Sequence, residues 1–171
     1  MRLKSLSPVK KRAKSNMKNS SVQPLGVYEI TLKGADGQIK EHFFSKNLVV
    51  QTGKNIIASL LVADGKAKKP SKMQVGTSSV PVEVSDVALK SPVASNPVTL
   101  VETETKRINN QVTYTATFPI GTAIGTLCEV GIFAQYDSDA DGTTLFSRSV
   151  FPPITKEQDD ELTIRWAITI A

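Results

Sequence analysis

The sequence has 171 residues, 40% of them hydrophobic, which is enough for one globular domain with its own core. Its single cysteine excludes an internal disulfide, no apolar run approaches the roughly 20 residues of a membrane span, and no apolar segment follows the charged N-terminus as in a signal peptide. We therefore expect a protein that is made and folds in a cytoplasm.

The formal net charge of +5 is unevenly distributed. Seven of the 21 basic residues and none of the 16 acidic ones lie within residues 1–20, so this segment carries +7 and the remainder −2. Residues 1–23 contain no aromatic residue and are too polar to fold alone, but their apolar residues recur at helical spacing. We expect an assembly arm at 1–23 and one domain at 24–171. The arm residues that we single out are Arg2, Leu3, Leu6, Val9, Lys10, Lys11, Arg12, Lys14, Met17 and Lys18.

Two kinds of partner fit the charge of this arm. Its lysines and arginines could contact phosphates of a nucleic acid without sequence preference, although no aromatic residue is interleaved to stack on bases. A basic arm that grips an acidic protein neighbour fits the same pattern. We favour the protein neighbour.

The first half of the domain predicts two strands and a helix. Strands at 27–33 and 38–45 are joined by an Asp-Gly turn, and a short extended piece follows at 48–50. Helical spacing then predicts one helix over about 53–63, with Thr52 as its N-cap and Gly65 just past its end. Its apolar face would hold Ile56, Ile57, Leu60 and Leu61.

The second half predicts further strands. A short strand at 73–75 precedes a long irregular link at 77–96 that contains three prolines. Strands follow at 98–108, 111–118 and 162–170, the last two with one apolar and one mostly polar face. We expect one core that buries together Trp166, Phe118, Tyr114, Ile164, Ile132 and Ile57.

Residues 126–151 predict a β-hairpin. Alternating residues form its first arm, turn formers fill 137–142, and the second arm is expected to end at Pro152-Pro153, where ladder hydrogen bonds stop. Many strands with one helix predict a mainly β fold. The expected fold is an antiparallel β-sandwich of jelly-roll type with one packed helix, plus the extended basic N-terminal arm.

The hairpin turn also resembles the start of a calcium loop. Asp137, Asp139 and Asp141 precede Gly142, but Arg148 occupies the twelfth position, where calcium loops have a bidentate Glu, and strands rather than helices flank the turn. An acidic hairpin tip is the favoured interpretation. His42 is the only histidine and Cys128 lies on an apolar strand face, so we expect no catalytic residues, no metal and no cofactor.

Several short runs, taken in order, resemble tail-collar and tail-fibre-attachment proteins of tailed bacteriophages. The run EVGIF at 129–133 and the following G…LFSR at 142–148 resemble one family motif, and the runs KNLVV…TGK at 46–54, QVGT…P…D…L at 74–89 and ELTIRW at 161–166 resemble others. The residues that carry the first motif are Glu129, Gly131, Phe133, Gly142, Leu145 and Arg148.

This resemblance implies a non-enzymatic structural protein of the virion that oligomerises around the tail axis and anchors neighbouring tail or fibre proteins. Because no fibre shaft or receptor-binding tip follows the domain in this sequence, we expect a connector, collar or baseplate component. The alternative, from another class, is a carbohydrate- or nucleic-acid-binding β-sandwich module.

Overall fold

The computed structural model describes residues 25–93, 98–99, 105–139 and 142–170, so the predicted arm at 1–23 lies outside the described residues. The described chain contains nine strands and one helix. Their bounds are β1 (Leu25–Lys33), β2 (Ile39–Val49), α1 (Gln51–Val62), β3 (Lys72–Gly76), β4 (Val98–Thr99), β5 (Lys106–Ile108), β6 (Gln111–Phe118), β7 (Gly125–Ala134), β8 (Thr144–Lys156) and β9 (Glu161–Thr169).

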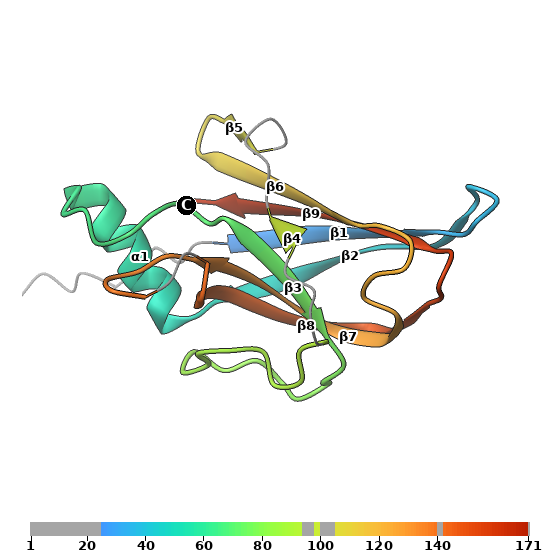
Figure 1. Cartoon of the computed structure of the whole chain (residues 1–171). Helices are drawn as coiled ribbons and strands as arrows, with labels where there is room; N and C mark the ends of the chain where they lie inside the picture. Colours follow the sequence, from blue (N-terminus) through green and yellow to red (C-terminus); the bar gives the residue numbers. More distant parts are fainter. Residues whose placement is uncertain (1–24, 94–97, 100–104, 140–141, 171) are drawn as a thin grey trace, which may run out of the picture.

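All nine strands belong to one antiparallel sheet, in the order β4-β3-β7-β8-β2-β1-β9-β6-β5. The sheet is curled, so that the β1, β9 and β6 part faces the β3, β7 and β8 part across the interior (Figure 1). Strand β2 joins the two parts: it pairs with β1 along most of its length but with β8 only at Leu48 and Val49. The mainly β, antiparallel class with one helix is as predicted, and hydrogen bonding links both parts into a single sheet.

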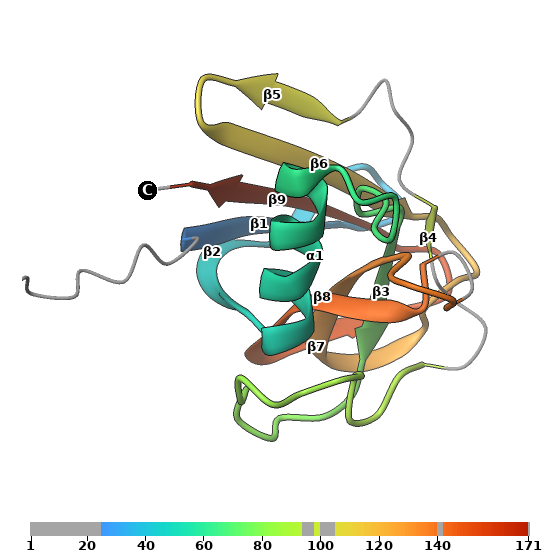
Figure 2. The ribbon, with the colours of Figure 1, turned by 90° about the vertical axis from the view of Figure 1, so that its left-hand side faces the viewer.

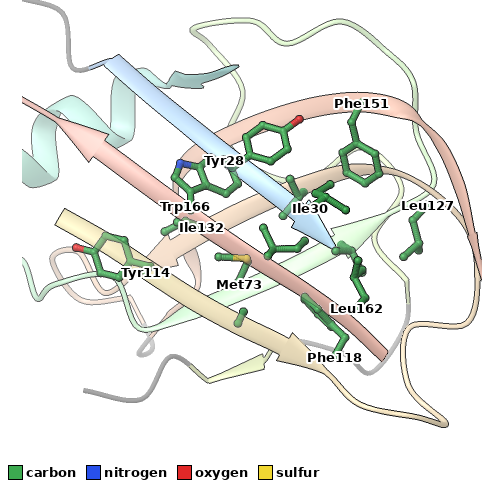
Figure 3. Close-up of a cluster of buried hydrophobic side chains, with 14 of the residues drawn as sticks. Tyr28, Ile30, Met73, Tyr114, Phe118, Leu127, Ile132, Phe151, Leu162 and Trp166 are labelled. Atoms are coloured by element: carbon green, nitrogen blue, oxygen red, sulfur yellow. The ribbon is translucent and has the colours of Figure 1, made fainter. Parts of the chain in front are cut away.

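The apolar core fills the inside of this curl. Trp166 of β9 stacks on Tyr28 of β1 with ring centroids 5.1 Å apart, and Met73 and Ile132 lie opposite them on β3 and β7 (Figure 3). The prediction is confirmed for Trp166, Phe118, Tyr114, Ile164 and Ile132, which are all buried in this cluster.

Helix α1 covers one end of the curled sheet (Figure 2), and it begins two residues earlier than predicted. The predicted cap is wrong: Val50 is the N-cap residue without a side-chain hydrogen bond, and the Thr52 hydroxyl donates instead to the carbonyl of Leu145. The predicted C-terminal glycine is also wrong, because Ala63 takes the left-handed conformation with φ of 52°.

The apolar face of α1 is rotated from the predicted one. The helix buries Gly53, Ile56 and Ser59, while Ile57 is only half-buried against the core. Leu60 and Leu61 are 44% and 81% exposed, so their predicted burial is wrong. The likeness of four apolar residues at helical spacing hides this rotation, because two adjacent stripes of the helix are both apolar.

Two predicted strands also differ. The single strand at 98–108 is wrong, because β4 pairs with β3 and β5 pairs with β6, at the two opposite edges of the sheet. Strand β8 does not stop at Pro152-Pro153 but continues to Lys156. Both prolines are exposed at a register shift in the β7–β8 ladder, where a missing N–H leaves no ladder bond unmade.

No helix among the described residues is long and apolar enough to cross a bilayer.

Candidate functional site

The segment between β3 and β4 forms a loop that is closed on itself. The amide of Thr77 donates to the carbonyl of Ser91 at 2.9 Å, and the amide of Val93 donates to the carbonyl of Val75 at 3.0 Å. Residues 77–91, called here the anchored loop, therefore leave the sheet and return to it at nearly the same place. Figure 1 shows the loop extending along the outside of β7 and β8, away from the core.

A buried arginine of β8 reaches out of the sheet into this loop. Arg148 has a fully buried side chain, and its guanidinium nitrogens donate to the backbone carbonyls of Val80 at 3.0 Å and Pro81 at 3.4 Å. Loops seldom bury carbonyl groups, because such groups need a donor once water is removed. Arg148 supplies that donor and so fixes the path of the loop at residues 80 and 81.

Two carboxylates balance the charge of this arginine. Glu129 of β7 accepts from Arg148 Nε at 2.9 Å and lies 2.8 Å from its Nη2. Asp86 of the loop accepts from Arg148 Nη1 at 3.0 Å. Lys90 forms a further ion pair with Asp86 at 2.7 Å, so the four groups, called here the charge cluster, are neutral together. A buried charge is tolerated only when it is paired in this way.

The carboxylates also bind the backbone of the loop. Glu129 accepts from the amide of Lys90 at 3.1 Å and from that of Ser91 at 2.7 Å, and Asp86 accepts from the amide of Glu83 at 3.0 Å. Each carboxylate thus uses one side for Arg148 and the other for the main chain. Because such hydrogen bonds to a charged group are directional, the cluster determines the shape of the loop as well as its attachment.

The ionisation of Asp86 follows from these contacts. Burial raises the pKa of its carboxyl group, but hydrogen bonds from the Glu83 amide, from Lys90 and from Arg148 outweigh burial and hold the pKa below its ordinary value. Asp86 is therefore an anion at neutral pH. The charge cluster is an ion-paired structure under physiological conditions rather than a set of neutral acids.

An apolar contact next to the charge cluster completes the attachment. Leu89 of the loop packs with Val50, Phe133 and Leu145 on the outer face of the sheet. Two glycines make the close approach possible: a side chain on Gly131 would lie 2.9 Å from Leu89, and one on Gly76 would lie 2.5 Å from both Glu129 and the Ser91 carbonyl. The loop sits on a surface without protruding side chains.

The predicted motif residues meet at this place. Glu129 and Arg148 form the charge cluster, Phe133 and Leu145 form the apolar contact, and Gly131 leaves room for Leu89. Only Gly142 lies apart, in the hairpin turn with φ of 69°, against the aliphatic part of Lys72. Residues 44 to 60 positions apart in the chain were not expected to share one cluster: the roles of Lys90 and of the Val80 and Pro81 carbonyls carry no signal in the sequence.

The predicted calcium-loop residues have other contacts. Asp139 accepts a hydrogen bond from the Thr144 hydroxyl, and Asp137 takes a left-handed conformation with φ of 55° in the turn. Asp141 lies outside the described residues. Within the described part of the chain, no three His, Cys, Asp or Glu side chains are grouped so that they could hold a metal ion.

A second set of buried charges holds the turn between β8 and β9. Lys156 is fully buried and donates to the carbonyls of Pro119 at 3.0 Å and of Asp160, while Asp160 pairs with Lys40 at 3.0 Å. Burial lowers the pKa of the Lys156 amine, against the opposing effect of Asp160. These contacts tie turns together at the end of the sheet, where Lys40 and Asp160 belong to different hairpins.

Comparisons of the chain with protein-family models, with curated proteins and with solved structures give no match.

Proposed function

We propose that this chain is a non-enzymatic structural protein of a tailed-bacteriophage virion, a connector, collar or baseplate component. In this role it oligomerises around the tail axis and anchors neighbouring tail or fibre proteins. Its partners are other copies of itself and adjacent virion proteins, and it works without a cofactor. It is made in the host cytoplasm and ends in the particle.

One observation carries this proposal. The residues of the resemblance, which come from β3, the anchored loop, β7 and β8, converge on one cluster that shapes an exposed loop. Such an investment of buried charge is expensive unless the shape of the loop matters. A loop held in one conformation is suited to binding a neighbour, because little further ordering is needed on association.

The jelly-roll arrangement belongs to this proposal. The two facing parts of the curled sheet enclose the core as the layers of a β-sandwich do. Structural domains of virus particles include double-sheet jelly rolls. We assign the described domain to that architectural group, with β2 as the strand that passes from one layer to the other.

The basic arm at 1–23 is the second element of the proposed assembly. Its seven basic residues would steer it toward an acidic neighbour, and the stripe of Leu3, Leu6, Val9 and Met17 would be buried there. Deletion of residues 1–20 should leave thermal stability nearly unchanged, because every described strand lies after them, but should block incorporation into particles. Normal incorporation of the shortened chain would remove the arm from the proposal.

Mass spectrometry of purified virions tests the proposal as a whole. The protein should be present in intact particles at a fixed ratio to the major tail proteins. Its absence from particles, together with free protein in the lysate, would contradict the proposal.

The alternative of a carbohydrate- or nucleic-acid-binding module has less support. Trp166, the only tryptophan, is fully buried beneath Tyr28 and offers no surface for a sugar ring. Binding of nucleic acid through the arm would weaken steeply between low and moderate salt. A salt-insensitive association with particles would therefore favour the structural role.

A further inference from the structure

Two exposed apolar patches lie at opposite ends of helix α1. The first is the tip of the anchored loop, where Val80, Val84 and Val87 are 53%, 43% and 69% exposed. The second is a groove of about 230 Å³ beside the last turns of the helix, between α1 and the ends of β6 and β9. Its walls include Ile57, Leu60, Leu61, Pro70, Val112 and Ile170.

The two patches face different directions. The loop tip is tied to the start of α1, because the amide of Gln51 donates to the carbonyl of Val84 at 2.8 Å. The groove uses Leu60 and Leu61, near the other end of the helix. A helix of this length spans about 18 Å, and Figure 2 shows the loop below α1 and strand β6 beside its upper end. The patches cannot contact each other within one molecule.

The charges around the patches are opposite. Residues 77–87 of the loop contain Glu83 and Asp86 but no basic residue. The groove walls contain no charged residue, and basic residues flank them: Arg107 lies opposite Val112 in the β5–β6 ladder, and Lys69 precedes Pro70 in the chain. Complementary charge of this kind orients two surfaces and speeds their encounter.

We propose that the valine tip of the anchored loop of one copy binds in the helix-side groove of the next copy. This inference rests on the proposed function, which requires contacts between copies, and it specifies the surfaces. Because the two surfaces differ, the contact is heterologous, and repeated contacts of this type close into a ring or continue as a filament. A ring is what assembly around an axis needs.

The charge cluster gives this contact its stiffness. Arg148 holds the carbonyls of Val80 and Pro81, and Asp86 holds the amide of Glu83, so the backbone is fixed while the valine side chains point outward. A loop that is already ordered loses little entropy on binding. The groove itself is preformed between a helix and a sheet.

The basic arm fits the groove less well than the loop does. The start of β1 is near the groove, since Leu25 pairs with Thr169 and Ile170 lines the groove. An arm that carries +7, however, would meet Arg107 and Lys69 at the groove margin, and like charges there oppose binding. The arm is therefore one outcome of the test and not the proposed occupant.

Complementary variants of the full chain test the proposal. Val87→Lys damages only the loop tip and Leu61→Lys damages only the groove; both residues are exposed, so folding should be unaffected, and melting curves check this. Sedimentation velocity over a concentration series should show assembly of the wild-type chain and about tenfold or greater weakening for each variant. Val87→Glu should weaken assembly less than Val87→Lys, because of the basic groove margin.

Mixing the two variants gives the decisive result. Each variant keeps one intact surface, so an equimolar mixture should form one-to-one dimers and nothing larger. Ile39→Lys serves as the control: Ile39 is 59% exposed at the start of β2, and the β1–β2 turn lies at the end of the molecule opposite α1 (Figure 1), so this variant should assemble normally.

Three outcomes would overturn the proposal. They are a wild-type chain that stays monomeric, variants that assemble like the wild type, and loss of assembly on deletion of residues 1–20, which would assign the groove to the arm. These results are separate from the virion test of function. Presence in particles with normally assembling variants rejects only this contact, whereas self-assembly without presence in particles rejects only the function.

Discussion

The two faces of the β7–β8 hairpin are both buried, but by different chemistry. On the inner face Val130 and Ile132 belong to the apolar core with Trp166. On the outer face Glu129 and Arg148 belong to the charge cluster beneath the anchored loop. The same two strands therefore separate an apolar interior from an ion-paired one.

This difference assigns different tasks to the two faces. Burial of a large apolar side chain contributes about 1.5–3 kcal/mol and depends little on direction. A buried ion pair gains little net stability, because desolvation offsets the attraction, but it tolerates few geometries. We conclude that the inner face supplies most of the stability and that the outer face determines where the loop lies.

The largest loss of stability should come from the inner face. Trp166→Ala should lower the free energy of unfolding by about 3–5 kcal/mol, because it removes a fully buried ring that stacks on Tyr28. Urea unfolding measures this change. Trp166→Phe is the matched control and should lose less. A near-wild-type unfolding curve for Trp166→Ala would show that this ring does not carry the core.

Breaking the charge cluster should cost nearly as much. Arg148→Met leaves Glu129 and Asp86 buried without their common partner, and such a change lowers the free energy of unfolding by about 3–5 kcal/mol. We expect the lower end of that range, because the loop can open and hydrate both carboxylates. Lys90→Met is the control: the Lys90 side chain is 42% exposed, so its loss should matter much less. Equal losses in the two variants would contradict the central place of Arg148.

A smaller effect should appear as a dependence on pH. The pKa of Asp86 is lower in the folded chain than its unfolded value of about 3.9. Its contribution to stability is therefore fully present above that unfolded value and is lost as the pH falls through the lower, folded value. Asp86→Asn should cost about 1–3 kcal/mol near neutral pH, and its difference from the wild type should shrink in acid. Urea unfolding at several pH values measures this difference, and a constant gap would contradict the ionised state of Asp86.

The smallest effect is expected at the hairpin turn. Calcium should leave the melting temperature unchanged, because Asp139 already accepts the Thr144 hydroxyl and Arg148 takes the place of the expected Glu ligand. Asp139→Ala alone should lower the free energy of unfolding by about 0.5–1.5 kcal/mol. A rise of the melting temperature with calcium that Asp139→Ala abolishes would instead identify a metal site.

The sequence predicted the parts of the fold that depend on local pattern. Strict alternation around Trp166 and Tyr114 located β9 and β6 and their core face, and the Asp-Gly turn located the β1–β2 hairpin. It failed where partners decide. Leu60 and Leu61 have helical spacing, but the face of α1 that packs against β8 is the one with Gly53 and Ile56.

The candidate site shows the same limit in another form. Glu129 and Arg148 could be singled out because they belong to a recurring run, yet nothing in that run states that their side chains leave the core side of the sheet. The backbone carbonyls of Val80 and Pro81 have no sequence signature at all. Contacts between a side chain and a distant main chain depend on the folded path of the loop, which no local pattern encodes.

Hydrogen exchange across the anchored loop tests the central claim most directly. In the wild type, the amides of Glu83, Lys90 and Ser91 donate to buried carboxylates and should be protected. In Arg148→Met, we predict fast exchange at these amides while the amides of β1, β6 and β9 keep their protection. Unchanged protection of the loop in this variant would contradict the claim that the charge cluster holds it.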